Sequence, residues 1–174
     1  RVIAHRAGGF LANKDTLEAC RRLGLVADSS LSPAAPNSPL NQEMTPSNLL
    51  TEVNGILEVP VTYYIQASIG PWRSMRIVDI EASTLTELRS IVRQARDGHL
   101  PTVNVLMHSF SFVRDGQVNY DVEERFAEFL EFLAQEPGIT VTTVSELHEE
   151  WAKGNLRDDN NTIVEPYTGW WLTY

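Results

Sequence analysis

The sequence predicts a single α/β domain in which strands alternate with helices. The chain has 174 residues, which is the size of one domain with a hydrophobic core of ordinary size. Short runs of β-branched residues alternate with segments whose apolar residues recur at helical spacing. Hydrophobic residues make up 43% and charged residues 21%, a balance typical of a folded protein. This alternation is compatible with an open parallel sheet or with part of a barrel.

The start of the chain is predicted to form a strand, a loop, a helix and a second strand. Residues 1–6 supply the first strand, and the two glycines that follow allow a sharp turn because neither carries a Cβ. Asp15 and Glu18 have the spacing of a capping box, so we expect a helix to begin there and to end at Gly24. Residues 25–27 then form a buried strand. Such a unit builds parallel sheets.

The middle of the chain begins with a long loop insertion over residues 31–55, which contains four prolines. Long irregular connections in compact domains are commonly functional or mobile. Residues 56–64 are rich in β-branched and aromatic side chains and predict a strand, which Pro60 places near an edge or a bulge. Residues 77–80 predict a shorter strand.

The second half is predicted to contain three helices and two strands. A capping box over 84–87 opens the first helix, which ends before Gly98. Residues 102–107 are the strongest predicted strand. The remaining elements are a helix over 122–134, a strand over 139–143, a helix that Ser145 caps and that runs to about Lys153, and an aromatic tail over 154–174.

Charge and cysteine content narrow the classes of partner and site. The net charge is −9 and the isoelectric point is near 4.9, so the surface repels phosphate backbones and anionic lipid. We therefore expect no nucleic-acid partner. The single cysteine, Cys20, excludes an intramolecular disulfide and a cysteine-based zinc site. No apolar run approaches the roughly 18 residues that a transmembrane helix needs.

The chain begins with Arg1 and leads at once into a strand-like run. Because chain ends are usually loosely ordered, we expect the sequence to continue a longer protein. A removed signal peptide is the alternative, and no targeting segment remains to test it. We slightly favour a cytoplasmic location over an extracytoplasmic one.

Three reactive side chains, Arg6, Asp28 and His108, each follow a predicted strand. In parallel α/β folds, ligands collect at the carboxyl ends of strands. A histidine titrates near neutral pH, an aspartate can orient it, and an arginine can keep a carboxylate ionised. These groups predict a proton-transfer site. The alternatives are a surface ion pair for Arg6, a turn role for Asp28 and a hydrogen-bonded core position for His108.

Three short motifs resemble those of the polysaccharide deacetylases, a family of metal-dependent carbohydrate esterases. Residues 6–10 (Arg-Ala-Gly-Gly-Phe) are similar to the family's third motif, and residues 26–30 (Val-Ala-Asp-Ser-Ser) to its fourth. Residues 105–109 (Val-Leu-Met-His-Ser) resemble the fifth. The motifs occur in the family's order, and the resemblance covers roughly residues 1–150.

The resemblance implies a distorted (β/α) barrel, incomplete at its N-terminus in this sequence. Its implied activity is metal-assisted removal of N-acetyl groups from a polysaccharide or glycan precursor, in bacterial surface-glycan metabolism. His108 would be the general acid, Asp28 would pair with His108 and tune its pKa, and Arg6 would form a salt bridge with the base aspartate. Leu106 would line the pocket for the acetyl methyl group.

Further candidate substrate-binding residues are Phe10, Ser109 and Glu58. Glu58 stands among apolar residues and is a candidate for facing a cleft, although an outward position on an edge strand is the favoured alternative. His5 precedes Arg6, so the two should point to opposite faces of the strand, with His5 in a partly buried structural role.

The family's first two motifs, which carry the base aspartate and the metal-binding histidines, have no counterpart here. No His-x-x-x-His occurs in the sequence, so it contains no predicted metal ligand. The ligands of a divalent ion, expected to be zinc, are therefore expected before Arg1. The family's fourth motif usually has tryptophan after its aspartate, where this chain has Ser29.

The expected partner is an N-acetylated glycan, and the oligomeric state is not predicted. The alternative from another class is a catalytically inactive, deacetylase-like domain that binds carbohydrate or acts as a scaffold. A serine hydrolase using Ser109 and His108 is disfavoured because Gly-x-Ser-x-Gly is absent. Trp72, Trp170 and Trp171 are candidates for stacking on sugar rings, with a core or interface role as the favoured alternative.

Overall fold

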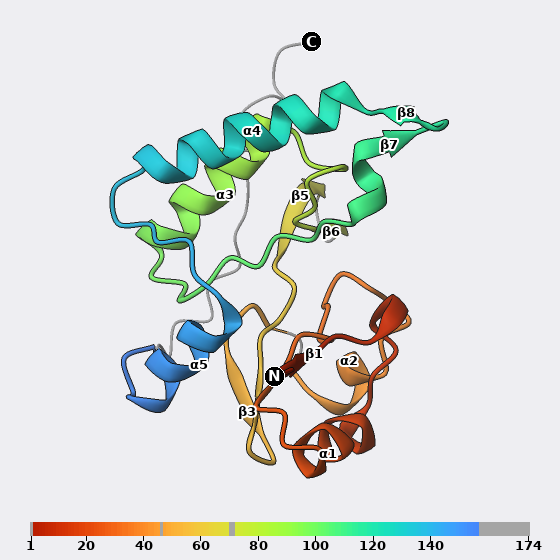
Figure 1. Ribbon diagram of the computed structural model, residues 1–174, viewed down its shortest axis with the longest axis vertical. Helices are drawn as coiled ribbons and strands as arrows, with labels where there is room; N and C mark the ends of the chain where they lie inside the picture. Colours follow the sequence, from red (N-terminus) through yellow and green to blue (C-terminus); the bar gives the residue numbers. More distant parts are fainter. Residues whose placement is uncertain (1, 46, 70–71, 157–174) are drawn as a thin grey trace.

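The computed structural model describes residues 2–45, 47–69 and 72–156, and Figure 1 shows their arrangement. The described helices are α1 (Lys14–Arg22), α2 (Leu40–Glu43), α3 (Leu85–Asp97), α4 (Tyr120–Gln135) and α5 (Val144–Ala152), with 3-10 turns η1 (Gly8–Phe10) and η2 (Ser109–Phe112). The described strands are β1 (Ala4–His5), β2 (Ala27–Asp28), β3 (Thr51–Val53), β4 (Ile56–Glu58), β5 (Tyr63–Ile69), β6 (Trp72–Ile77), β7 (Val113–Arg114) and β8 (Gln117–Val118). None of these helices combines the length and the apolar composition that a membrane crossing requires.

A four-stranded sheet with the order β1-β2-β4-β3 forms the N-terminal half. β1, β2 and β4 are parallel, and β3 pairs with β4 in the antiparallel sense. The register places His5 beside Asp28 and Asp28 beside Glu58. The predicted strand–helix–strand unit at the start of the chain is therefore confirmed, and its strands end at one edge.

Parallel pairing continues beyond this sheet through single backbone hydrogen bonds. The amide of Val78 donates to the carbonyl of Thr62 at 2.8 Å, and the amide of Leu106 donates to the carbonyl of Val78 at 2.8 Å. Asp79 and Leu106 form an isolated parallel bridge. The segment at 104–106 thus contacts both residue 62, through the Thr62 amide and the Asn104 carbonyl, and residue 78, and within the described part of the chain the extended segments do not close into a barrel.

Three strand predictions need correction. Residues 102–107 form a strand ladder only at Leu106, and residues 139–143 form none among the described residues. β-Branched composition favours extended backbone, but a strand also needs a hydrogen-bonded neighbour. The predicted strand over 56–64 divides into β4 and β5 around Pro60, which has no N–H to donate. The 31–55 insertion contains α2 and β3.

Two helix starts were misplaced by a few residues in the sequence-based prediction. α1 is capped by Asn13, whose side chain accepts a hydrogen bond from the amide of Thr16 at 2.9 Å, and not by Asp15. α5 is capped by Thr143 instead of Ser145, with Glu146 as the reciprocal partner. In both cases an earlier residue already satisfies the free amides of the first turn.

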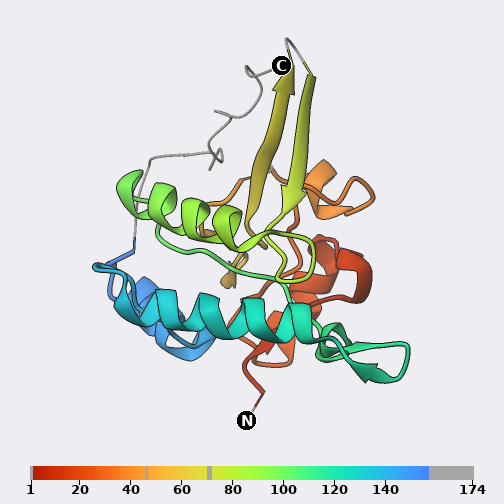
Figure 2. The same ribbon diagram turned by 90° about the horizontal axis from the view of Figure 1, so that it is seen from above.

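Helices α3 and α4 lie side by side (Figures 1 and 2). Their facing sides contribute to one buried hydrophobic cluster. Both helices were predicted, and the predicted apolar positions of α3 are buried, whereas Leu130 on the predicted apolar face of α4 is 43% exposed. The buried cluster includes Leu88 and Ile91 of α3 with Phe129 and Phe132 of α4. The β5–β6 hairpin extends away from these helices in Figure 2, with most of β6 exposed.

The Thr84 cap gives a direct test of the α3 start. Its hydroxyl accepts from the amide of Glu87 at 3.2 Å, and the Glu87 carboxylate accepts from the Thr84 amide at 2.8 Å. Thr84→Ala removes this cap and is expected to lower the free energy of unfolding by about 1 kcal/mol in urea denaturation. Thr86→Ala, an exposed change in the same turn, should stay within about 0.5 kcal/mol of wild type. Equal losses in the two variants would contradict the capping role.

Candidate functional site

The carboxyl edge of the parallel strands carries polar side chains on both faces. Side chains alternate along a strand, so His5, Asp28 and Glu58 share one face because they are neighbours in register. Arg6 and Ser29 follow them in sequence and point to the other face. The edge therefore holds two separate groups of residues.

The first group is buried and centres on Asp28. The Asp28 carboxylate is fully buried, and its Oδ2 lies 2.5 Å from Nδ1 of His5. Its Oδ1 accepts from the amide of Ser30 at 2.9 Å. Glu58 is also fully buried, and its Oε1 accepts from the amide of Leu31 at 2.8 Å. Its Oε2 has no hydrogen-bond partner among the described residues.

Burial shifts the protonation of this group. Removal from water raises the pKa of Glu58 to about 8, and the neighbouring Asp28 carboxylate adds to the shift. Cys20 of α1 faces the same group. Burial raises the pKa of its thiol, and Asp28 and Glu58 raise it further. Glu58 and Cys20 therefore bind their protons more tightly than the same side chains do in water.

The second group joins three distant segments through Arg6. Its Nε donates to the Ser29 carbonyl at 2.9 Å, and its Nη2 donates to Ser29 Oγ at 2.7 Å and to Asn104 Oδ1 at 3.2 Å. Asn104 Nδ2 in turn donates to Ser29 Oγ at 2.8 Å and to the carbonyl of Pro60 at 3.2 Å. Residues 6, 29 and 104 therefore meet at one edge although they are far apart in the chain.

Asn104 binds both Arg6 and Ser29 and so connects the second group to the segment before His108. Asn104→Ala would remove one of the two donors to Ser29 Oγ, the donor to the Pro60 carbonyl and one acceptor of Arg6 Nη2, so we expect a loss of about 1–3 kcal/mol in the free energy of unfolding. Gln135→Ala removes an exposed amide at the end of α4 and serves as the matched control. An Asn104→Ala protein as stable as that control would contradict the role of this network.

His108 takes no part in the hydrogen bond between His5 and the buried Asp28. Its side chain is exposed and stacks on Phe110, with ring centroids 4.5 Å apart and planes inclined by 9°. The Asp28–His108 pair that the resemblance implies is therefore not formed in this structure. The strand register places His5 next to Asp28, and the two side chains bind each other.

The other predicted substrate-binding residues are spread over several elements. Leu106 is 8% exposed and sits at the bridge to Asp79. Phe10 ends η1 with a positive φ of 60°, and Ser109 is exposed at the start of η2. Glu58 is fully buried, so the favoured outward position is wrong.

Two of the three tryptophan candidates for sugar stacking, Trp170 and Trp171, lie outside the described residues. Trp72 is 80% exposed on β6, so its side chain is accessible, and the core alternative is wrong for it.

Sequence reasoning missed three contacts that define the site. His5 was expected to point away from Arg6 in a partly buried structural role; its side chain is 34% exposed, so the partial burial is confirmed and the role stays a prediction. Its pairing with Asp28 was not predicted. Cys20 and Asn104 gave no sequence signal beyond their residue types, because only the register of distant segments brings them to the site.

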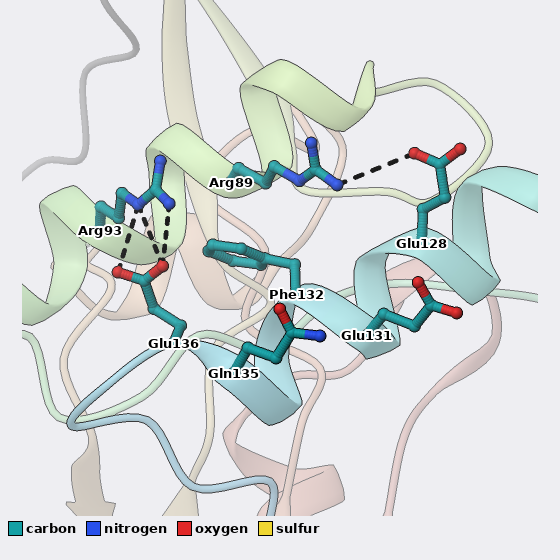
Figure 3. A pocket seen from close by; sticks show the side chains of 7 residues that line it. All are labelled: Arg89, Arg93, Glu128, Glu131, Phe132, Gln135 and Glu136. Atoms are coloured by element: carbon teal, nitrogen blue, oxygen red, sulfur yellow. Dashed lines mark hydrogen bonds and ion pairs between the residues drawn. The ribbon is translucent and has the colours of Figure 1, made fainter.

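A pocket of about 420 Å³ lies between α3 and α4, on residues that take no part in the candidate site (Figure 3). Ion pairs join Arg93 to Glu136 at 2.9 Å and Arg89 to Glu128 at 3.8 Å. Both guanidinium groups also lie over the Phe132 ring, at 5.0 and 5.7 Å from its centroid. Both arginines are paired with glutamates across the two helices, so we assign this pocket a role in helix contact.

The residues present do not fit the metal that the resemblance implies. Among the described residues, the group with potential metal-ligand spacing is His5, Cys20 and Asp28. It contains a single histidine. A site with two histidines at metal-ligand spacing cannot be built from it, and no catalytic step is derived through that metal.

The two groups at the strand edge and His108 are therefore the candidate functional residues. Comparison of the chain with models of known families, with curated proteins and with solved structures finds no match.

Proposed function

We propose that the chain is part of a metal-dependent hydrolase that removes N-acetyl groups from a polysaccharide or glycan precursor. The observation that carries the proposal is the hydrogen-bonded group of Arg6, Ser29 and Asn104. Two of these residues belong to the segments that resemble the third and fourth deacetylase motifs, and the third directly precedes the segment that resembles the fifth. The segments thus share one edge, as parts of one active site should.

The order of the parallel segments supports a barrel of the deacetylase type. β1, β2 and β4 are parallel neighbours in chain order, and the pairing continues from residue 62 to 78 and from 78 to 106. A doubly wound sheet reverses its strand order at a switch point, whereas a barrel adds each strand beside the previous one. No reversal occurs among these parallel segments.

His108 is proposed as the general acid that protonates the leaving amine. A general acid must come within hydrogen-bond distance of the group it protonates. The exposed imidazole meets this need, since a substrate can approach it from solvent. Alternation along extended backbone places residues 104, 106 and 108 on one side, so His108 belongs to the side from which Asn104 reaches Arg6.

Arg6 is proposed to hold a carboxylate of the catalytic site in its ionised form. Its hydrogen bonds to Ser29 and Asn104 use Nε and Nη2 and fix the guanidinium plane. Nη1 takes part in none of them and is the group that we propose binds the acidic partner. Leu106 is retained as the apolar contact for the acetyl group, whereas Asp28 acts through His5 and not through His108.

The second candidate function is a catalytically inactive domain that binds carbohydrate. Among the described residues His108 has no carboxylate partner, and it forms a flat stacked pair with Phe110. Exposed aromatic faces suit the apolar faces of sugar rings. In this function the His108–Phe110 pair binds a glycan and does not catalyse its hydrolysis.

Acetate release distinguishes the two functions. The intact protein is incubated with N-acetylglucosamine oligomers, and acetate is measured with and without a chelator, while calorimetry measures binding. The proposed hydrolase releases acetate, and chelation stops the release. Binding with no acetate at any metal concentration would favour the inactive domain and contradict the proposal.

A further inference from the structure

We infer that His5, Cys20, Asp28 and Glu58 form a binding site for a zinc-class transition-metal ion, separate from the metal of the proposed hydrolase. The four side chains come from β1, α1, β2 and β4. They lie where the helix packs on the carboxyl ends of the three parallel strands.

The geometry brings three kinds of ligand atom together, so Cys20, which as the single cysteine was expected to exclude a cysteine-based zinc site, is here one ligand of a mixed set. A ring nitrogen of His5, Sγ of Cys20 and a carboxylate oxygen of Asp28 all lie within 4.8 Å of one another. Zinc binds nitrogen, sulfur and oxygen at about 2.0–2.3 Å, which puts ligand atoms of a tetrahedral site roughly 3–4 Å apart. Modest side-chain rotation therefore closes the group around an ion.

An independent observation points to a missing cation, namely the carboxylate of Glu58. Glu58 is Asp28's neighbour in register, both are fully buried, and Oε2 of Glu58 has no partner among the described residues. Buried carboxylates are normally paired or bound to metals, because leaving them without a partner is costly. Oε2 of Glu58 is therefore the oxygen that we propose as the fourth ligand, next to the group of His5, Cys20 and Asp28.

The donor set selects the class of ion. Imidazole and thiolate favour zinc, cobalt and similar ions, while calcium and magnesium prefer oxygen ligands throughout. The side chain of His5 is 34% exposed, whereas Cys20 is 5% exposed and the two carboxylates are fully buried. A metal ion can therefore enter past the partly exposed His5 and reach the other three ligands, which are buried away from water.

Cobalt provides a direct test because a thiolate bound to Co²⁺ absorbs in the near ultraviolet. Titration of the metal-free protein with Co²⁺ is expected to saturate at about one ion per chain with a thiolate-to-cobalt band, as expected for a single site. Zn²⁺ should then remove the band by displacement. Cys20→Ser should abolish it, and His148→Gln, which changes a histidine on α5, should leave it unchanged.

A second variant keeps the test decisive if Cys20→Ser does not fold. Glu58→Gln preserves the shape of the side chain and removes its charge, so we expect Co²⁺ affinity to fall by roughly 10–100-fold, with circular dichroism confirming the fold. Folded wild-type protein without the band, or a band that survives Cys20→Ser, would overturn the proposal. Glycan deacetylation is measured separately, so either result leaves the test of the hydrolase intact.

Discussion

Replacing His108 with alanine is expected to lower the turnover of an N-acetylated glycan by roughly 10²–10⁴-fold, which is the usual contribution of a general acid. The leaving amine departs poorly unless it gains a proton, which we propose the exposed His108 imidazole provides. Because the loss concerns the transition state, kcat should fall far more than KM rises. Initial rates of acetate release over a range of substrate concentrations provide the measurement.

Two control variants separate this role from general damage. His148→Ala alters a histidine on α5 and should leave turnover near the wild-type value. Ser109→Ala should also retain general-acid catalysis, whereas a serine hydrolase would lose its nucleophile. A His108→Ala protein with wild-type turnover would remove this residue from the mechanism.

Glu58→Gln is expected to change how stability depends on pH, by several kcal/mol across the neutral range. In the folded chain burial raises the pKa of Glu58 to about 8, compared with about 4.3 for an unfolded glutamate. The folded state therefore favours the protonated form. This contribution to stability is complete below about pH 4.3 and is lost as the pH rises through 8, at about 1.4 kcal/mol per pH unit.

Glutamine stays neutral at every pH, so the Glu58→Gln protein should lose this slope and should unfold at higher urea than wild type at pH 8. Urea unfolding with a chelator present, at several values between pH 5 and 8, measures the effect. His5, Cys20, Asp28 and Arg6 surround the same site and remain unchanged in the variant.

The matched control is Glu52→Gln on the adjacent strand β3, where the side chain is exposed. Its pH slope should equal that of wild type. A Glu58→Gln protein that retained the wild-type slope would show that Glu58 ionises normally in the folded chain.

Local signals in the sequence predicted the helices better than the strands. α3 was predicted with its cap and its buried face, because Thr84, Glu87 and the apolar spacing are all local features. The segments at 102–107 and 139–143 have equally strong strand composition, yet a ladder depends on which segment lies alongside. That information is absent from the local sequence.

The candidate site shows the same division. The positions of Arg6 and Asp28 at strand ends followed from their places in the sequence. Their partners did not, because the register of β1 against β2 sets His5 beside Asp28 and leaves His108 outside the pair. The protonation of Glu58 was equally hidden, since burial of an ionisable group among apolar neighbours depends on the packing of distant segments.

Parallel measurement of acetate and free amine from one N-acetylated glycan tests the central claim most directly. If the intact protein hydrolyses the amide, the two products should appear in equal amounts, and both should decline together in His108→Ala. Acetate without a matching amine would indicate ester cleavage, and the absence of both from a folded, metal-supplied protein would contradict the proposed function.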